Sequence, residues 1–328
     1  MPKKNSRPDS PAGSADRPRT LGSWLAHAER LYAQHEVAVG QTATSAHDEA
    51  LYLLLRTLHL PLDSQPAVLT RRVSGAEGAA LEKMLRQRVV DRVPAAYLTH
   101  EAFLGGHRFY VDERVIIPRS YFVELIPQLG LWLKKPAAVA RVADMCTGSG
   151  CLAILLAHQY PRARVDAVDC SADALAVAKI NVRQHGLSDR VSLYRSDVFA
   201  SVPAAHYDVI VCNPPYEPSR LMKTLPPEFR REPKLALDGG KDGLDVIRRL
   251  IAQARDRLTA DGLLLIEVGG LRNAMKTAFG GLKLRWLRTH DGSNCVCLAR
   301  MRHTALRSRA TVCPMHNSAD PGVQGIRA

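Results

Sequence analysis

The sequence predicts an α/β fold in which a mostly parallel, Rossmann-like sheet follows a small N-terminal helical domain. Three observations predict it. Strand-like and helix-like segments alternate from Arg141 onward, a glycine turn follows the first of these strands, and an earlier Leu- and Ala-rich stretch repeats apolar residues at helical spacing. Alternating strands and helices predict parallel strands with helices on both faces. The 328 residues are enough for one large domain with a core and a smaller partner domain.

Two tails and a helical domain are expected outside the sheet. Residues 1–19 and 303–328 lack an apolar period, so we expect both to be disordered basic tails. Residues 20–101 form the helical domain, whose role we interpret as substrate recognition; a plain helical cap is the alternative. Residues repeat at intervals of three and four on three mainly apolar faces of this domain: Leu21, Trp24, Leu25, Ala28 and Leu31; Ala50, Leu51, Leu54, Leu55 and Leu58; Ala80, Leu81, Met84, Leu85, Arg88 and Val89.

A β-hairpin linker is expected at residues 102–118. Gly105-Gly106 offers a turn, and two β-rich runs, at 107–111 and 114–118, lie close by. The main domain follows at residues 119–302.

Strands and helices alternate within the main domain, and a hairpin closes it. The expected strands lie at 141–148, 164–171, 191–197, 208–216 and 263–269, and the expected helices at 151–159, 172–185, 243–258 and 271–279. Asp291-Gly292 offers the turn of a terminal hairpin between 282–289 and 294–300. This hairpin predicts one antiparallel edge strand.

The composition is typical of a soluble globular protein. Hydrophobic residues make up 46% and charged residues 23% of the chain. No window of roughly 18 consecutive apolar residues occurs, and the N-terminus has no apolar core of a secretory signal. We therefore expect a cytoplasmic protein. The formal charge of +13 suggests a nucleic-acid-rich or acidic partner, although the two tails carry part of the excess.

Cysteines and histidines indicate neither a disulfide framework nor a metal site. The seven cysteines are odd in number and include no CxxC pair, which favours buried reduced thiols. The twelve histidines are scattered and follow no spacing such as HExxH. We expect no metal.

A glycine loop follows the first strand of the main domain. The glycines of Gly148-Ser149-Gly150 allow a tight turn and the close approach of a ligand. Asp169 ends the second strand, where it can accept hydrogen bonds from ribose hydroxyls. A dinucleotide and S-adenosylmethionine both carry adenosine, so the loop alone leaves both cofactors open.

Two further carboxylates border this loop. Asp144, inside the first strand, would lie near the amino-acid end of S-adenosylmethionine; capping the loop's own amides is the alternative. Asp197 ends the third strand, where it can accept from the adenine amino group; a helix N-cap is the alternative.

The sequence Asn213-Pro214-Pro215-Tyr216 ends the fourth strand and indicates the chemistry. The carboxyl end of a parallel strand faces the ligand crevice, and two prolines stiffen the chain there. The Asn213 side-chain carbonyl and the Pro214 backbone carbonyl can accept both hydrogens of one planar NH₂ group. Tyr216 can stack on that group and stabilise positive charge. Holding both hydrogens aligns the nitrogen lone pair with a sulfonium methyl, so these residues predict methyl transfer to a planar amide or amine nitrogen without a metal.

The chain resembles the class I S-adenosylmethionine-dependent methyltransferases and, within them, the HemK family of protein N5-glutamine methyltransferases. The resemblance runs from about Leu21 to Arg300 and includes the helical domain and the hairpin linker. It is carried by the segments DMCTGSGCLAI at 144–154, AVDCSADALAVAKINV at 167–182, CNPPY at 212–216 and PPEFRREPKLALDGGKDGL at 226–244.

The resemblance implies a cofactor, site residues and a substrate. S-adenosyl-L-methionine would be the cofactor, and Asn213 to Tyr216, Pro215 included, would hold a glutamine amide. The implied cofactor contacts are Thr147, Gly148, Ser149, Gly150, Asp169 and Asn213, with Asp197 matching less firmly.

Cys146 and the segment 109–120 resemble the corresponding residues in one branch of the family. That branch methylates a glutamine of large-subunit ribosomal protein L-three, free or in an assembling subunit. Contact of the basic tails with ribosomal RNA would follow. The chain departs from that branch at Tyr121 to Val123 and at Arg231, which stands in place of a common histidine.

Four other functions stay open at the level of sequence. A release-factor GGQ glutamine methyltransferase would share the fold, the cofactor and the chemistry. An adenine-N6 DNA or RNA methyltransferase would use Asn213 to Tyr216 in the same way, although the chain has no large insertion to read a flipped base. An NAD(P)-dependent oxidoreductase fits the glycine loop alone. A non-catalytic RNA-binding or assembly factor could retain the fold.

Overall fold

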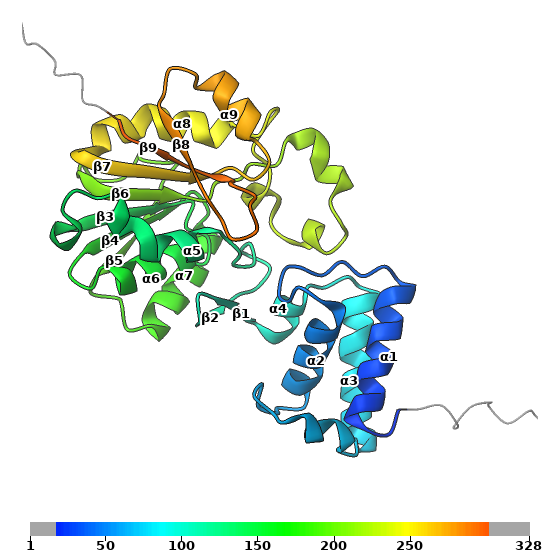
Figure 1. The fold of residues 1–328 in the computed structure, drawn as a ribbon. Helices are drawn as coiled ribbons and strands as arrows, with labels where there is room; N and C mark the ends of the chain where they lie inside the picture. Colours follow the sequence, from blue (N-terminus) through cyan, green and yellow to red (C-terminus); the bar gives the residue numbers. More distant parts are fainter. Residues whose placement is uncertain (1–17, 302–328) are drawn as a thin grey trace, which may run out of the picture.

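The computed structural model describes residues 18–301, which form a helical part and a sheet-containing part joined by a hairpin (Figure 1). Apart from Pro18 and Arg19, the two expected tails lie outside these residues. Within 18–301, no helix is long and apolar enough to cross a membrane.

The helical part consists of amphipathic helices, three of which have side-chain N-caps. It contains α1 (Leu21–Gln34), α2 (Ala46–Thr57), α3 (Gly75–Val89) and α4 (Ala95–Thr99), with a 3₁₀ turn at Pro66–Thr70. The side chains of Thr20, Ser45 and Ser74 accept hydrogen bonds from backbone amides in the first turns of α1, α2 and α3. The predicted apolar faces meet in one core, which confirms the three helices. Ala80 is the exception, because it is exposed on α3.

The hairpin linker differs from the prediction in its strand pairing. β1 (Glu101–Leu104) pairs with β2 (His107–Tyr110) across Gly105-Gly106, whereas the expected second run at 114–118 is not a strand. Both glycines have positive φ, as a two-residue hairpin turn requires, so the turn joins the residues on its two sides.

Seven strands form one sheet in the order β5-β4-β3-β6-β7-β9-β8. Their bounds are β3 Arg141–Met145, β4 Arg164–Asp169, β5 Val191–Arg195, β6 Tyr207–Cys212, β7 Leu258–Glu267, β8 Leu284–Leu287 and β9 Val296–Ala299. The expected terminal hairpin is confirmed, because β8 and β9 pair antiparallel. The expectation that the strand running against the others would lie at the edge was wrong. The edge strand β8 runs parallel to β7, and the antiparallel strand β9 lies between them because it pairs with both neighbours.

Helices cover both faces of the sheet, as the alternating pattern predicts (Figure 1). One face carries α5 (Phe122–Leu125), α6 (Cys151–Gln159) and α7 (Ala172–Gln184); the other carries α8 (Asp245–Ala254) and α9 (Arg272–Ala278). Short 3₁₀ turns lie at Ile126–Leu131, Pro136–Ala138, Ser219–Thr224, Phe229–Arg231, Lys234–Ala236 and Arg255–Arg257. The expected helix 243–258 is shorter, since Gly243 has φ +83° and Leu258 already pairs with Tyr207.

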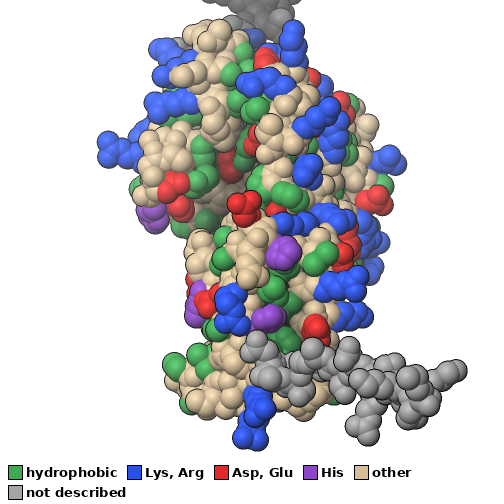
Figure 2. All heavy atoms as spheres, turned by 90° about the vertical axis from the view of Figure 1, so that its right-hand side faces the viewer, with side chains coloured by type: hydrophobic (Ala, Val, Ile, Leu, Met, Phe, Trp, Pro, Cys, Tyr) green, Lys and Arg blue, Asp and Glu red, His purple; other side chains and the backbone are tan. Residues whose placement is uncertain are grey.

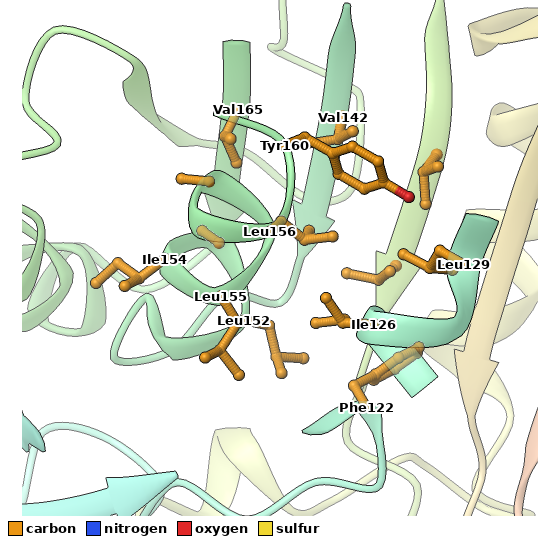
Figure 3. Close-up of a cluster of buried hydrophobic side chains, with 14 of the residues drawn as sticks. Phe122, Ile126, Leu129, Val142, Leu152, Ile154, Leu155, Leu156, Tyr160 and Val165 are labelled. Carbon is orange, nitrogen blue, oxygen red and sulfur yellow. The ribbon is translucent and has the colours of Figure 1, made fainter. Parts of the chain in front are cut away.

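The first face packs as a continuous apolar core (Figure 3). Leu152 and Leu156 of α6 lie beside Ile126, next to Phe122 of α5, and all four side chains are buried. Each such burial stabilises the fold by roughly 1.5–3 kcal/mol. This packing holds α6 against the sheet and thereby holds the loop from which α6 starts.

Candidate functional site

A cavity of about 900 Å³ opens at the carboxyl ends of the central strands. Strand β3 lies between β4 and β6, so the order of the strands reverses there, which is where open α/β sheets bind ligands. The residues that line the cavity all lie between Arg114 and Arg249, so it belongs to the sheet-containing part, on which Figure 2 shows a hollow. The site predicted from the sequence therefore coincides with a cleft.

The glycine loop forms one wall of this cleft. Thr147, Gly148 and Ser149 line it, whereas Gly150 does not. Gly150 has φ +81° at the N-cap of α6, and a Cβ on it would lie 3.2 Å from that of Ala178. Gly150 thus serves the turn and the close packing of α6 on α7, while Gly148 presents backbone to the cavity.

The structure corrects the expectation that Asp144 reaches a ligand. Asp144 is fully buried and does not line the cleft. Its Oδ2 accepts from the Thr147 hydroxyl at 2.5 Å and from the Ala153 amide at 3.0 Å. The alternative, that Asp144 caps the loop's own amides, is met only in part, because its partners are the hydroxyl of Thr147 and the amide of Ala153 in α6. Burial raises the pKa of Asp144 to about 7.

Asp144 gives a pH dependence of stability that can be measured. A carboxyl whose pKa is raised on folding keeps its proton longer in the folded chain, so stability falls as pH rises from about 4 to about 7. With about 1.4 kcal/mol for each pKa unit, the loss would be about 4–5 kcal/mol. Asp144→Asn should flatten this decline, as urea unfolding at pH 5 and pH 8 would show. An unchanged difference between the two pH values would contradict the assignment.

Asp169 and Asp197 both line the cleft. Asp169 accepts from the Gly148 amide and the Ser171 amide, each at 2.9 Å, so it lies between the glycine loop and the start of α7. The Asp197 side chain is 57% exposed, and its Oδ1 lies 3.1 Å from Nε of Arg249. The alternative of a helix N-cap is wrong for Asp197, because no helix begins after it among the described residues.

Asn213, Pro214, Pro215 and Tyr216 line the same cleft. Asn213 Nδ2 donates to the backbone carbonyl of Arg119 at 3.4 Å. This contact orients the side-chain amide and leaves Oδ1 of Asn213 to accept from another group. Burial raises the pKa of Tyr216, which keeps its phenol neutral.

Gly269 supports the position of the Tyr216 ring. A Cβ at Gly269 would lie 2.6 Å from the ring, and the residue has φ +49°. We therefore expect Gly269→Ala to displace Tyr216 and lower turnover at least tenfold, because small displacements in a site have large effects on rate. Cofactor affinity, measured by calorimetry, should change less than threefold. Gly281→Ala is the matched control, since no atom lies within 4 Å of its added Cβ. Normal turnover of Gly269→Ala would show that the ring does not need this support.

A third wall of the cleft comes from the segment 225–240. Glu232, in this segment, accepts from both terminal nitrogens of Arg119, at 2.5 and 2.6 Å. It also accepts from the Gln41 side chain of the helical part, at 3.0 Å. The Arg119 carbonyl also accepts a hydrogen bond from the side chain of Asn213. Hydrogen bonds therefore connect Gln41 of the helical part, through Glu232 and Arg119, to Asn213 in the cleft.

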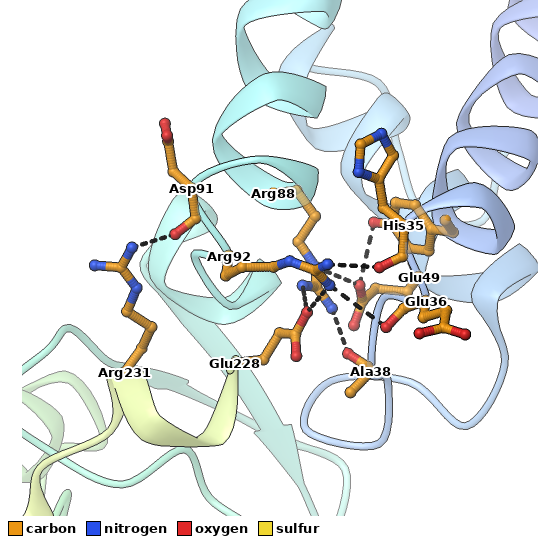
Figure 4. A network of polar contacts seen from close by, with 10 residues as sticks. His35, Glu36, Ala38, Glu49, Arg88, Asp91, Arg92, Glu228 and Arg231 are labelled. Carbon is orange, nitrogen blue, oxygen red and sulfur yellow. Dashed lines mark hydrogen bonds and ion pairs between the residues drawn. The ribbon is translucent and has the colours of Figure 1, made fainter. Parts of the chain in front are cut away.

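Glu228, in the same segment, enters a buried ionic network with the helical part (Figure 4). Glu228 Oε1 lies 2.8 Å from Arg92 and 3.6 Å from Arg88, and Arg88 Nε lies 2.7 Å from Glu49. The side chains of Arg88, Glu49 and Glu228 are almost wholly buried. Nearby, Arg231, which stands where the family commonly has a histidine, donates a hydrogen bond to the backbone carbonyl of Asp91. Arg231 therefore contributes to the contact with the helical part.

The sequence did not identify Arg119, which lines the cleft, or Glu228 and Glu232, which support the cleft wall at 225–240. Glu228 and Glu232 fall in the segment 226–244, which carries the family resemblance but whose sequence alone indicates no role for them. The charged residues Glu49 and Arg88 lie in helices whose other buried residues are apolar. Buried charges are rarely unpaired, so these two residues indicate that an oppositely charged partner such as Glu228 must lie nearby.

Comparisons with known proteins agree with the geometry of the cleft. Residues 130–225 match the family model described as a methyltransferase small domain. The chain is 48% identical to the ribosomal protein uL3 glutamine methyltransferase of Burkholderia pseudomallei, over 85% of the chain and 94% of the relative. It is 48% identical to the protein of the same name from Bordetella pertussis, with the same coverage, and 46% identical to that of Bradyrhizobium diazoefficiens, over 83% and 88%.

Proposed function

The chain belongs to the family of ribosomal protein uL3 glutamine methyltransferases, and from this premise we propose that it transfers a methyl group from S-adenosyl-L-methionine to the side-chain amide nitrogen of a glutamine in uL3. The observation that carries the proposal is the orientation of Asn213 at the cleft. Its Nδ2 donates a hydrogen bond to the backbone carbonyl of Arg119, so its Oδ1 is free to accept from an amide NH₂ group.

The residues of the cleft fit S-adenosyl-L-methionine. Gly148 leaves open space, because a Cβ there would meet only Ile116, at 3.6 Å. Asp169 stands beside it with a carboxylate suited to ribose hydroxyls, and Asp197 lies further along the same cleft, where an amino group of adenine could donate to it. A volume of about 900 Å³ is large enough for this cofactor and one glutamine side chain together.

The protein's own part in the reaction is to orient the amide nitrogen and exclude water. The cofactor supplies a methyl group bonded to a positively charged sulfur. Asn213 Oδ1 and the Pro214 carbonyl would accept the two amide hydrogens and hold the nitrogen lone pair in line. Charge that develops on the nitrogen would be stabilised by these two acceptors and by the Tyr216 ring. The new bond from nitrogen to the methyl carbon would replace the bond from that carbon to sulfur. The nitrogen would then lose one proton to water, so no strong base is needed beforehand.

We further propose that the helical domain recognises the substrate and that the enzyme meets uL3 on ribosomal particles in the cytoplasm. Removing the +5 of residues 1–17 and 302–328 from the formal +13 leaves +8 on residues 18–301. Lys and Arg side chains gather along one edge of the face in Figure 2. Free uL3 is itself basic, so RNA-rich particles suit this charge better.

The test is methyl transfer to purified acceptors. The enzyme would receive tritiated S-adenosyl-L-methionine with uL3, immature large subunits, a class-one release factor or unmodified total RNA. We expect label on uL3, and salt-dependent binding to the immature subunits. Label on the release factor alone would move the substrate to the other branch of the family, and label in RNA would refute glutamine as the acceptor.

A further inference from the structure

Three histidines meet where the hairpin contacts the main domain. His107 begins β2, His158 lies in the last turn of α6, and His185 is the C-cap of α7. One ring nitrogen from each lies within 4.8 Å of the other two. The rings of His107 and His158 are stacked at 4.7 Å between centroids, and His185 lies 5.6 and 5.8 Å from them. The three histidines are far apart in sequence, and their spacing matches no metal-binding motif.

Three convergent imidazoles are a ligand set for a divalent transition metal. Nitrogens bound to one tetrahedral zinc lie roughly 3.3 Å apart, since each Zn–N bond is about 2.0–2.1 Å. The lone pair of an imidazole lies in the plane of its ring, so the stacked rings of His107 and His158 would have to turn toward the ion to bind it together. His107 and His185 are partly buried and His158 is exposed, so an ion can enter from solvent and keep a water as its fourth ligand.

Contacts around the rings favour metal binding. Nε2 of His185 lies 3.0 Å from the Arg108 carbonyl. A carbonyl only accepts, so Nε2 carries the proton and Nδ1 keeps its lone pair; metal-binding histidines usually make such a second contact.

We propose that His107, His158 and His185 bind one divalent transition-metal ion, zinc foremost, which fastens the hairpin to α6 and α7. The three histidines do not line the cleft, so the ion would be structural. Asn181 of α7 already holds this unit together from the other side, because it bonds the Tyr110 backbone at 2.7 and 3.0 Å and the Ser149 carbonyl at 2.8 Å. The metal would add a second set of contacts that hold the hairpin linker against the main domain.

The experiment uses the full chain without a histidine tag, after treatment with a chelator. Zinc would be titrated by calorimetry, cobalt by its visible absorption, and melting would be followed with and without zinc. We expect one equivalent to bind and the melting temperature to rise by about 4 °C. His158→Ala should weaken zinc binding at least tenfold and abolish the rise, whereas His206→Ala, at an exposed histidine outside the cluster, should behave as the parent chain.

Two results would overturn the proposal. One is the absence of saturable binding at one equivalent in the parent chain, and the other is full zinc affinity in His158→Ala. Metal-free His158→Ala should melt with the metal-free parent and methylate uL3 at the parent rate, which separates loss of the metal from loss of the fold. If His158→Ala itself unfolds, the same comparison with His107→Ala decides.

Discussion

Asn213→Ala is expected to lower the turnover of uL3 methylation by a factor of about 10²–10³. The substitution removes an acceptor that stabilises charge on the reacting nitrogen, and the loss of one such preorganised contact has effects of this size. Its contact with the Arg119 carbonyl is also lost, so the strand end is held less firmly. Single-turnover rates with tritiated cofactor would measure the effect.

Cofactor affinity distinguishes a lost acceptor from a damaged site. Calorimetry should show a change in affinity for S-adenosyl-L-methionine that is far smaller than the change in turnover. Asn273→Ala, at an exposed asparagine of α9, is the matched control and should retain the parent rate. If Asn213→Ala kept more than a tenth of the parent turnover, the proposed role of Asn213 would be refuted.

Arg88→Met is expected to destabilise the protein by about 3–5 kcal/mol. Methionine keeps much of the side-chain length and removes the charge, which leaves Glu49 and Glu228 buried with Arg92 as the remaining cation of the group. Removing one partner of a buried ionic group leaves a charge that neither water nor protein compensates. Urea unfolding followed by circular dichroism would give the change in free energy of unfolding.

An exposed arginine provides the comparison for Arg88. Arg248 is 44% exposed and pairs with Asp242, whose side chain is 45% exposed. Such surface pairs contribute about 0–1 kcal/mol, so Arg248→Met should unfold within about 1 kcal/mol of the parent chain. Equal effects of Arg88→Met and Arg248→Met would show that the network in Figure 4 does not hold the helical domain to the cleft wall.

The site was predicted best where each of its residues lies at the end of a recognisable strand. The glycine loop, Asp169 and Asn213 to Tyr216 each follow a strand of the parallel sheet, and parallel strands end at one edge. Local signals therefore sufficed to place these residues in one cleft. Asp144 shows the limit of this reasoning, since position in the first strand does not reveal whether a side chain faces the ligand or the loop beneath it.

By itself, the sequence determined the order of strands and helices, the apolar faces of α1 to α3 and the motifs of the cofactor cleft. These depend on periodicity and on residues a few positions apart, which local backbone geometry governs. Only the tertiary structure decided that β9 lies inside the sheet, that Glu228 and Glu232 connect the cleft to the helical domain, and that three distant histidines meet. Those features arise from contacts between segments far apart in the chain, where packing and charge pairing select the partners.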